Sequence, residues 1–160
     1  MSSIDRAKTL KQLRRLSHLL DNAIPIPGTP YRFGLDPLLG MVPGGGDVAG
    51  ALLSAYIILQ SARLGLPKAS LGRMFLNVLT EMVLGVIPLL GDLFDFAWKA
   101  NAKNVELLES HVRDRSTQEN ADVRFAVLLG IALVAVAVLL IVLGISIAWS
   151  LLQLLSSLSK

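Results

Sequence analysis

Five carboxylates, in or beside two segments rich in glycine and proline, are the side chains of this sequence that could do chemistry. They are Asp36, Asp47, Glu81, Asp92 and Asp95. Oxygen ligands of this kind are the ones that hard cations prefer, and acids within apolar segments of a membrane protein are costly enough to suggest a proton or ion site. The five acids are therefore candidates for ion binding or, as below, for helix capping.

A capping role needs no ligand. Asp47 and Asp92 each follow a glycine and precede an apolar residue. A carboxylate at a helix start accepts hydrogen bonds from unpaired backbone N–H groups and faces the positive end of the helix dipole. We favour this interpretation, because nothing in the sequence brings the acids together in space. The alternative is a pair of broken helices that free backbone carbonyls, as at transporter sites.

The acids belong to a motif that occurs twice. The first copy, DPLLGMVPGGGDV, runs from Asp36 to Val48, and the second, EMVLGVIPLLGDL, runs from Glu81 to Leu93. Each position of the second copy lies 45 residues after its counterpart, as Asp92 does after Asp47. The shared pattern is Gly-x-x-Pro-x-x-Gly-Asp, and a fixed period of this length indicates a duplicated structural unit.

Other catalytic signatures are weak, so we expect no enzyme, no metal centre and no cofactor. Gly44 to Ala49 (GGGDVA) fits a relaxed dinucleotide-binding string, but no β-strand is expected before it. No Gly-Lys-Ser/Thr completes a P-loop, and the two histidines, His18 and His111, lack metal-ligand spacing. The chain has no cysteine, which excludes disulfides and thiolate ligands within it.

The composition predicts a membrane protein. Of the 160 residues, 53% are hydrophobic and 17% are charged, which is too apolar for an ordinary soluble domain. No charge occurs from Phe125 to Ser159, and Phe125 to Ile147 alone exceeds the roughly 20 apolar residues that span a bilayer. We expect a transmembrane helix over residues 124–152, with Trp149 as an interfacial anchor. The net charge of +3 fits anionic lipid better than nucleic acid.

Residues 1–24 are expected to form a basic amphipathic helix, because apolar residues recur at helical spacing and most basic residues lie off that stripe. This helix either lies on an anionic leaflet or packs on the protein with a solvated basic face. A Pro/Gly connector over 25–34, a duplicated helical domain over 35–115 and a polar linker over 116–123 follow. No signal peptide is evident, so the N-terminus is expected in the cytoplasm.

Two apolar helices are expected in the first part of the duplicated domain. The first has a charge-free core of 15 residues, Val48 to Ala62, which is marginal for crossing a bilayer. Small residues recur at every fourth position of this helix and form a face where another helix, including one from a second copy, can approach closely. They are Gly46, Gly50 and Ser54. A further amphipathic helix is expected from Asp92 to about Arg115.

Charge limits how the two apolar helices can meet a membrane. Their connecting turn carries Arg63, Lys68 and Arg73 without an acid, and the first 34 residues are also basic. The positive-inside tendency therefore places both regions in the cytoplasm, which a full transmembrane hairpin cannot satisfy. A shallow or re-entrant hairpin, or a compact helical domain resting on the membrane, can satisfy it.

The segment from about Leu35 to Glu109 resembles a family of small prokaryotic proteins described as domain of unknown function 4112. The resemblance depends on the paired Pro-x-x-Gly-Asp units, the Ala-Arg-Leu-Gly turn and the segment FDFAWKANAKN, which occur together in this order. It implies a membrane-associated helical domain and supplies no catalytic residue.

These observations predict an all-α protein, with a membrane-associated helical domain built on the duplicated unit and a C-terminal transmembrane helix. The expected function is a non-enzymatic structural or interaction role at the inner (plasma) membrane of a prokaryote. The alternative is a small oligomeric ion channel or transporter that uses the repeat carboxylates. Expected partners are the bilayer, with anionic lipids at the basic N-terminal helix, and further copies in a homo-oligomer; no nucleic acid is expected.

Overall fold

The computed structural model describes residues 3–25, 27–29, 32–35, 45–85, 98–113 and 122–158. The helices in this part of the chain are α1 (Ser3–Asn22), α3 (Gly45–Arg63), α4 (Lys68–Gly85), α6 (Ala100–Arg113) and α7 (Val123–Leu158). Two short strands, β1 (Ile24–Pro25) and β2 (Arg32–Phe33), pair antiparallel after α1. The predicted all-α class is confirmed.

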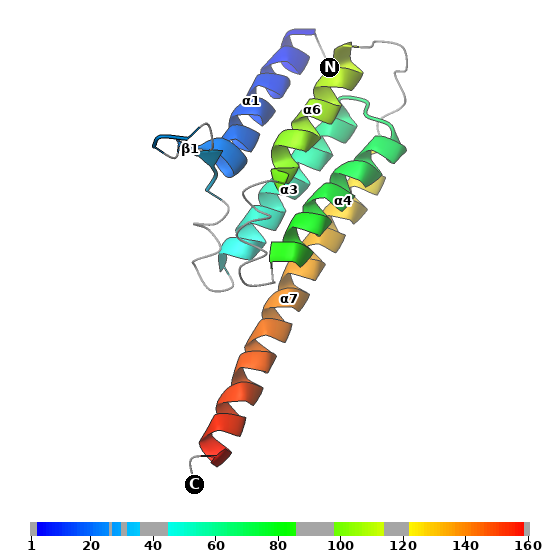
Figure 1. Cartoon of the computed structure of the whole chain (residues 1–160). Coiled ribbons are helices and arrows are strands. Elements are labelled where there is room, and N and C mark those ends of the chain that lie inside the picture. Colours follow the sequence, from blue (N-terminus) through cyan, green and yellow to red (C-terminus); the bar gives the residue numbers. More distant parts are fainter. Residues whose placement is uncertain are drawn as a thin grey trace.

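The helices form a bundle from one end of which α7 projects (Figure 1). α3 and α4 run antiparallel and are joined at the opposite end, where α7 also begins. α3 packs chiefly on α7, α1 packs on α6, and α4 contacts α3, α6 and α7. The start of α3 and the end of α4 therefore lie at the end from which α7 projects.

α3 is the core helix of this bundle. Its Ile57, Ile58 and Ala62 are fully buried, and it contacts α1, α4, α6 and α7. A helix that is apolar on nearly every side must be covered by protein or by lipid, and here neighbouring helices cover it. Only Leu52 and Tyr56 among its large apolar side chains are exposed. α3 is thus packed among the other helices of the bundle.

A Schellman motif closes the turn between α3 and α4. Gly65 has φ +93°, a left-handed conformation that glycine adopts without strain. The N–H of Gly65 donates to the carbonyl of Ala62 at 2.9 Å, and the N–H of Leu66 donates to the carbonyl of Ser61 at 3.1 Å. Leu64 and Leu66 are buried, so the turn is anchored in the core and fixes how α4 returns along α3.

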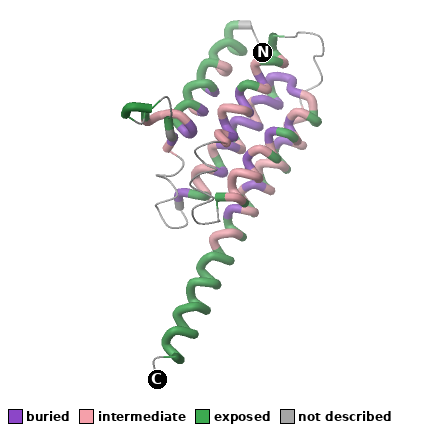
Figure 2. Tube along the Cα trace, viewed as in Figure 1, coloured by how far each residue is buried: buried purple, intermediate pink, exposed green. Residues whose placement is uncertain are grey.

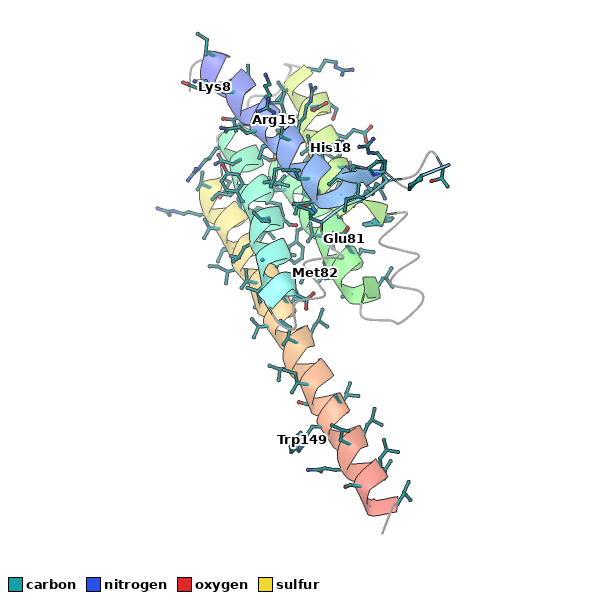
Figure 3. All side chains as sticks on the ribbon, turned by 90° about the vertical axis from the view of Figure 1, so that its left-hand side faces the viewer. Lys8, Arg15, His18, Glu81, Met82 and Trp149 are labelled. Carbon is teal, nitrogen blue, oxygen red and sulfur yellow. The ribbon has the colours of Figure 1, made fainter. Side chains whose placement is uncertain are left out.

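α1 packs on the bundle and keeps its basic side chains in solvent. Leu13 and Leu20 are buried, and α6 is the main neighbour of the helix. Figure 3 shows Lys8, Arg15 and His18 on the outer side of α1, where all three are exposed. Of the two arrangements expected for this helix, the structure shows the packed one.

The helix predicted from Asp92 to Arg115 is interrupted. Lys99 has φ +48°, a conformation that a residue with a side chain rarely adopts, and α6 begins at the next residue, Ala100. Most of the predicted helix before Lys99 lies outside the described residues. The break leaves the first N–H groups of α6 in need of partners from elsewhere in the fold.

α7 divides into two halves with different surroundings. In the proximal half, Val123–Ala137, the buried residues Ala126, Leu133 and Ala137 face the bundle, which α7 contacts through α3 and α4. In the distal half, Val138–Leu158, every residue from Val142 onward is exposed (Figure 2). Among the described residues, α7 is the one helix long and apolar enough to cross a membrane, and it contains the whole predicted span of 124–152.

Candidate functional site

The structure describes two of the five acids that the sequence singles out. Asp36, Asp92 and Asp95 lie outside the described residues. Asp47 is exposed in the first turn of α3, where its charge faces the positive end of the helix dipole. Because α3 begins at Gly45, Asp47 lies within the first turn and not at the capping position before it.

Glu81 caps a helix other than its own. It is half-buried near the end of α4, and its Oε1 accepts a hydrogen bond from the N–H of Ala100, the first residue of α6, at 3.3 Å (Figure 3). Among the described residues, no three His, Cys, Asp or Glu side chains gather as metal ligands do. An ion site that includes Asp36, Asp92 or Asp95 stays a prediction, because these three are not described.

Polar side chains from four helices meet around the start of α6, and we call this cluster the polar junction. Its members are Asp21, Ser54, Asn77, Glu81, Asn101 and Asn104. Asp21 Oδ2 accepts from the N–H of Ala102 at 2.7 Å, and its Oδ1 accepts from Asn101 Nδ2 at 3.0 Å. The Ser54 hydroxyl donates to Asn101 Oδ1 at 2.8 Å. Asn101 thereby connects α6 to both α1 and α3.

A second arm of the polar junction connects α6 to α4. Asn104 Nδ2 donates to the carbonyl of Met74 at 3.1 Å, and Asn104 Oδ1 accepts from Asn77 Nδ2 at 2.8 Å. The indole N–H of Trp98 donates to the carbonyl of Asn77 at 2.9 Å. The Lys103 ammonium lies 3.1 Å from the centre of the Trp98 ring, a cation–π contact.

Burial governs the electrostatics of the polar junction. Asp21 is only 6% exposed, and the loss of hydration raises the pKa of its carboxyl above the ordinary value of 3.8. Hydrogen bonds from Ala102 and Asn101 and the charge of Lys99 act in the opposite direction but do not outweigh burial. Lys99 itself donates to the side-chain oxygen of Asn22, next to Asp21 in the chain.

This arrangement is suited to holding helices together. Both carboxylate oxygens of Asp21 and the side-chain amides of Asn101 and Asn104 are engaged by other groups of the protein. Reaction with a substrate, or coordination of an ion, would require these atoms to exchange partners. A buried polar group that loses its partner costs about 1–3 kcal/mol, so the polar junction fixes the start of α6 against α1, α3 and α4.

The sequence patterns did not single out Asp21, Asn77, Asn101 or Asn104. The positions of Asn101 and Asn104 could have indicated that they are buried, since they lie three residues apart on α6 beside the apolar positions Val105 and Leu108. Amides on an otherwise apolar helix stripe predict buried hydrogen bonds. The role of Asp21 depends on a partner 80 residues away, which no local spacing indicates.

The small residues of α3 are used within the chain. Gly46 and Ser54 are buried and Gly50 is half-buried. Ser54 donates its hydrogen bond to Asn101 of α6, so the close helix approach predicted for this face occurs inside the bundle. Contact of this face with a second copy of the chain stays a prediction.

The fold is a small helical bundle with an apolar core, and one apolar helix extends from it. The polar junction lies within this bundle and holds the start of α6. The chain belongs to the family described as domain of unknown function (DUF4112), whose sequence model matches residues 9–112. The match reaches from α1 to α6, further than the resemblance over residues 35–109, and leaves α7 outside. The matched part of α1 includes Asp21, which caps α6. No curated protein and no solved structure matches the chain.

Proposed function

We propose that this chain is an integral membrane protein, anchored by the distal half of α7, whose bundle acts as a non-enzymatic structural or interaction module at the cytoplasmic face of a prokaryotic inner membrane. The observation that carries the proposal is the contrast within α7. From Val142 onward the distal half is exposed on every side and mostly apolar, whereas the proximal half shares the core of the bundle. Exposure of such an apolar surface to water is unfavourable, whereas lipid can cover it without that cost.

The length of the distal half fits a bilayer. Val138–Leu158 comprises 21 residues, which in a helix extend about 31 Å, close to the roughly 30 Å of hydrocarbon. Its serine hydroxyls donate to carbonyls of the same helix, as Ser146 does to Val142 at 2.7 Å and Ser150 to Ser146 at 2.9 Å. Hydroxyl groups satisfied in this way are tolerated in lipid.

The charge distribution supports a cytoplasmic bundle. Every Lys and Arg of the sequence except Lys160 precedes the distal half of α7. Positive residues are retained on the cytoplasmic side during insertion, so the bundle and the chain before it are expected there. The same excess of positive charge favours a membrane that contains anionic lipids.

The polar junction supports a role without catalysis. Its buried acid and amides bind one another and the backbone of neighbouring helices. Its parts therefore serve to keep the surfaces of the bundle in a fixed arrangement. A rigid bundle held at a membrane can present such surfaces to partners.

Extraction and topology together test the proposal. The full chain is expected to stay in the membrane pellet after alkaline carbonate treatment and to be released by detergent. Reporter fusions after Gly65 and Gln118 are expected to report the cytoplasm, and a fusion after Lys160 the opposite side. Release by carbonate would contradict the anchor. An external signal at Gly65 would contradict the cytoplasmic bundle, because α3 would then cross the membrane.

Flux measurements address the alternative role as an ion channel or transporter. Liposomes that contain the full chain are expected to show no ion flux above that of empty liposomes. Flux that appears with the full chain and disappears with Asp47→Asn combined with Asp92→Asn would replace our proposal by the ion channel or transporter.

A further inference from the structure

One side of the bundle carries exposed apolar side chains that no helix in the described part of the chain covers. On α3 these are Leu52, 54% exposed, and Tyr56; on the proximal half of α7 they are Val127, Leu128 and Ile131, the last 61% exposed. We call these five residues the α3/α7 face. Single exposed apolar side chains are common, but a group of them on two adjacent helices marks an interaction surface.

The five residues lie on the same side of the bundle. The position of a Cβ at Gly130 would be 3.2 Å from the Cβ of Ala55, so these two residues mark where α7 and α3 meet. Tyr56 follows Ala55 by one residue, and Ile131 follows Gly130 by one. Each is therefore rotated by the same angle away from the contact. Because α3 and α7 run antiparallel (Figure 1), this rotation turns both residues to the same side.

The α3/α7 face continues into the proposed span. Val138, Leu139 and Val142 extend the exposed stripe of α7 without interruption by a charge. The charge-free run from Phe125 to Ser159 has 35 residues and is about 52 Å long as a helix, whereas the hydrocarbon is about 30 Å thick and the bilayer with its headgroups about 40–45 Å. A tilt of about 35°, inside the observed range, would place the whole run within the bilayer.

Positive charge marks the edge of the α3/α7 face. α3 ends and α7 begins at the same end of the bundle, so Arg63 and Arg124 lie where the apolar surface stops (Figure 1). Both side chains are exposed. An arginine at the boundary of an apolar surface can bind a phosphate headgroup through its guanidinium, while its methylene groups lie against the hydrocarbon.

From these observations we infer that the α3/α7 face lies in the cytoplasmic leaflet of the membrane that α7 crosses, with Arg63 and Arg124 in contact with anionic phospholipid headgroups. The inference rests on the proposed function, since it takes the distal half of α7 as the anchor. It adds that α7 is tilted and that the hydrocarbon begins nearer Ile131 than Val138. It also moves the anionic-lipid contact, expected from the sequence at α1, to the α3/α7 face, because α1 packs chiefly on α6.

Spin labels at single cysteines test this contact, because the chain has no cysteine of its own. The variants Leu52→Cys and Ile131→Cys report the α3/α7 face, and Ile145→Cys reports the distal half of α7. Leu76→Cys is the matched control, since Leu76 is 56% exposed but lies in a groove between α4 and α6. Each full-length variant is labelled, reconstituted into vesicles of phosphatidylcholine and phosphatidylglycerol, and measured for collision with oxygen and with a water-soluble nickel complex.

Labels at positions 52, 131 and 145 are expected to collide with oxygen several-fold more, relative to nickel, than the label at position 76. Nickel access at 52 and 131 equal to that at 76, with 145 in lipid, would overturn the inference and leave the proposed anchor intact. Nickel access at 145 would overturn both. Exclusion of both reagents at 52 and 131, with spin–spin broadening between labels, would show a second copy on the face and also overturn the inference.

The headgroup contact has its own test. Arg63→Gln combined with Arg124→Gln is expected to abolish the increase in oxygen access at position 131 that phosphatidylglycerol produces over pure phosphatidylcholine. Arg15→Gln, an exposed arginine on α1, is the control and should leave that increase unchanged (Figure 3). A loss with Arg15→Gln but not with the double variant would assign the lipid contact to α1 and overturn this part of the inference.

Discussion

α3 and the distal half of α7 are both apolar on almost every side, yet the structure treats them in opposite ways. α3 has neighbours around most of its circumference and buries Ile57 and Ile58 completely. The distal half of α7 has no neighbour among the described helices from Val142 onward. Composition alone cannot separate these two cases, because a core helix and a lipid-exposed helix satisfy the same pattern.

The difference shows what an apolar side chain does in each helix. In α3 it packs against other side chains at the density of a protein interior, where each missing methylene leaves a cavity. In the distal half of α7, which we propose as the membrane anchor, fluid lipid would close around any shape, so size would matter little and polarity greatly. The two helices should therefore respond oppositely to truncation and to charge.

Truncation in α3 is expected to have the largest effect on folding. Ile58→Ala removes a fully buried side chain and should lower the free energy of unfolding of the bundle by about 2–5 kcal/mol. Ile145→Ala, the matched change in the distal half of α7, should leave that free energy unchanged. Denaturation in mild detergent, followed by Trp98 fluorescence in a Trp149→Phe background, measures both. Equal losses would mean that position 145 is packed against protein.

A charge in the distal half of α7 is expected to have the converse effect. Ile145→Arg should make insertion about 3–4 kcal/mol less favourable, which an insertion assay in microsomes or inverted vesicles measures, and should not change the unfolding of the bundle. Ile4→Arg on α1, where Ile4 is 72% exposed, is the control and should leave insertion unaffected. Normal insertion of the Ile145→Arg variant would remove the basis for the anchor.

Local patterns predicted which segments are helical and that one of them is long enough to span a membrane. They could not predict that other helices cover α3, because the cover over Ile57 and Ile58 comes from helices distant in sequence. They also could not place the start of α6 at Ala100, within the helix predicted over 92–115. Lys99 adopts a left-handed conformation that its residue type does not predict, and its ammonium donates to Asn22, a residue distant in sequence.

The candidate site, like the fold, has features that the sequence indicated and features that depend on tertiary contacts. Glu81 was recognised as an unusual acid, but its partner at Ala100 is a tertiary contact and not a neighbour in its own repeat. Asn101 and Asn104 lie in the segment that carries the family resemblance, but asparagine side chains alone did not suggest a catalytic or ion-binding role. Their importance follows from burial, which is a property of the assembled helices.

The polar junction offers a smaller test of the contrast, since the distal half of α7 has no comparable tertiary contacts. Asn101→Ala should cost about 1–3 kcal/mol of bundle stability, because it leaves Asp21 Oδ1 and the Ser54 hydroxyl without this partner. A double-mutant cycle with Ser54→Ala should give a coupling of about 0.5–3 kcal/mol. Ser150→Ala on α7 is the control, as its hydroxyl donates only to Ser146 of the same helix in the structure. A coupling of zero would mean that the Ser54–Asn101 bond contributes nothing to stability.

The smallest expected effects are two opposite dependences on pH, one from the interior of the bundle and one from the start of α7. Burial raises the pKa of Asp21 above 3.8, so the folded state binds its proton more tightly than the unfolded state. The stability that this proton adds is complete below pH 3.8 and is lost as pH rises through the pKa of the folded protein. Bonds from Lys68 and from the N–H of Phe125 lower the pKa of Asp122, so its contribution is present above pH 3.8 and is lost as pH falls through the lowered pKa.

Unfolding of the wild type, Asp21→Asn and Asp122→Asn in detergent, compared at acidic and neutral pH, separates the two groups. The stability difference between wild type and Asp21→Asn should change in favour of wild type as pH falls, because only the wild type gains the proton. The difference between wild type and Asp122→Asn should change against wild type over the same range. Slopes of the same sign would show that one carboxyl is not where the structure places it. Since Asp21 joins α1 to α6 and Asp122 joins the start of α7 to α4, opposite slopes would also show that protons affect the interior of the bundle and the start of α7 with opposite sign.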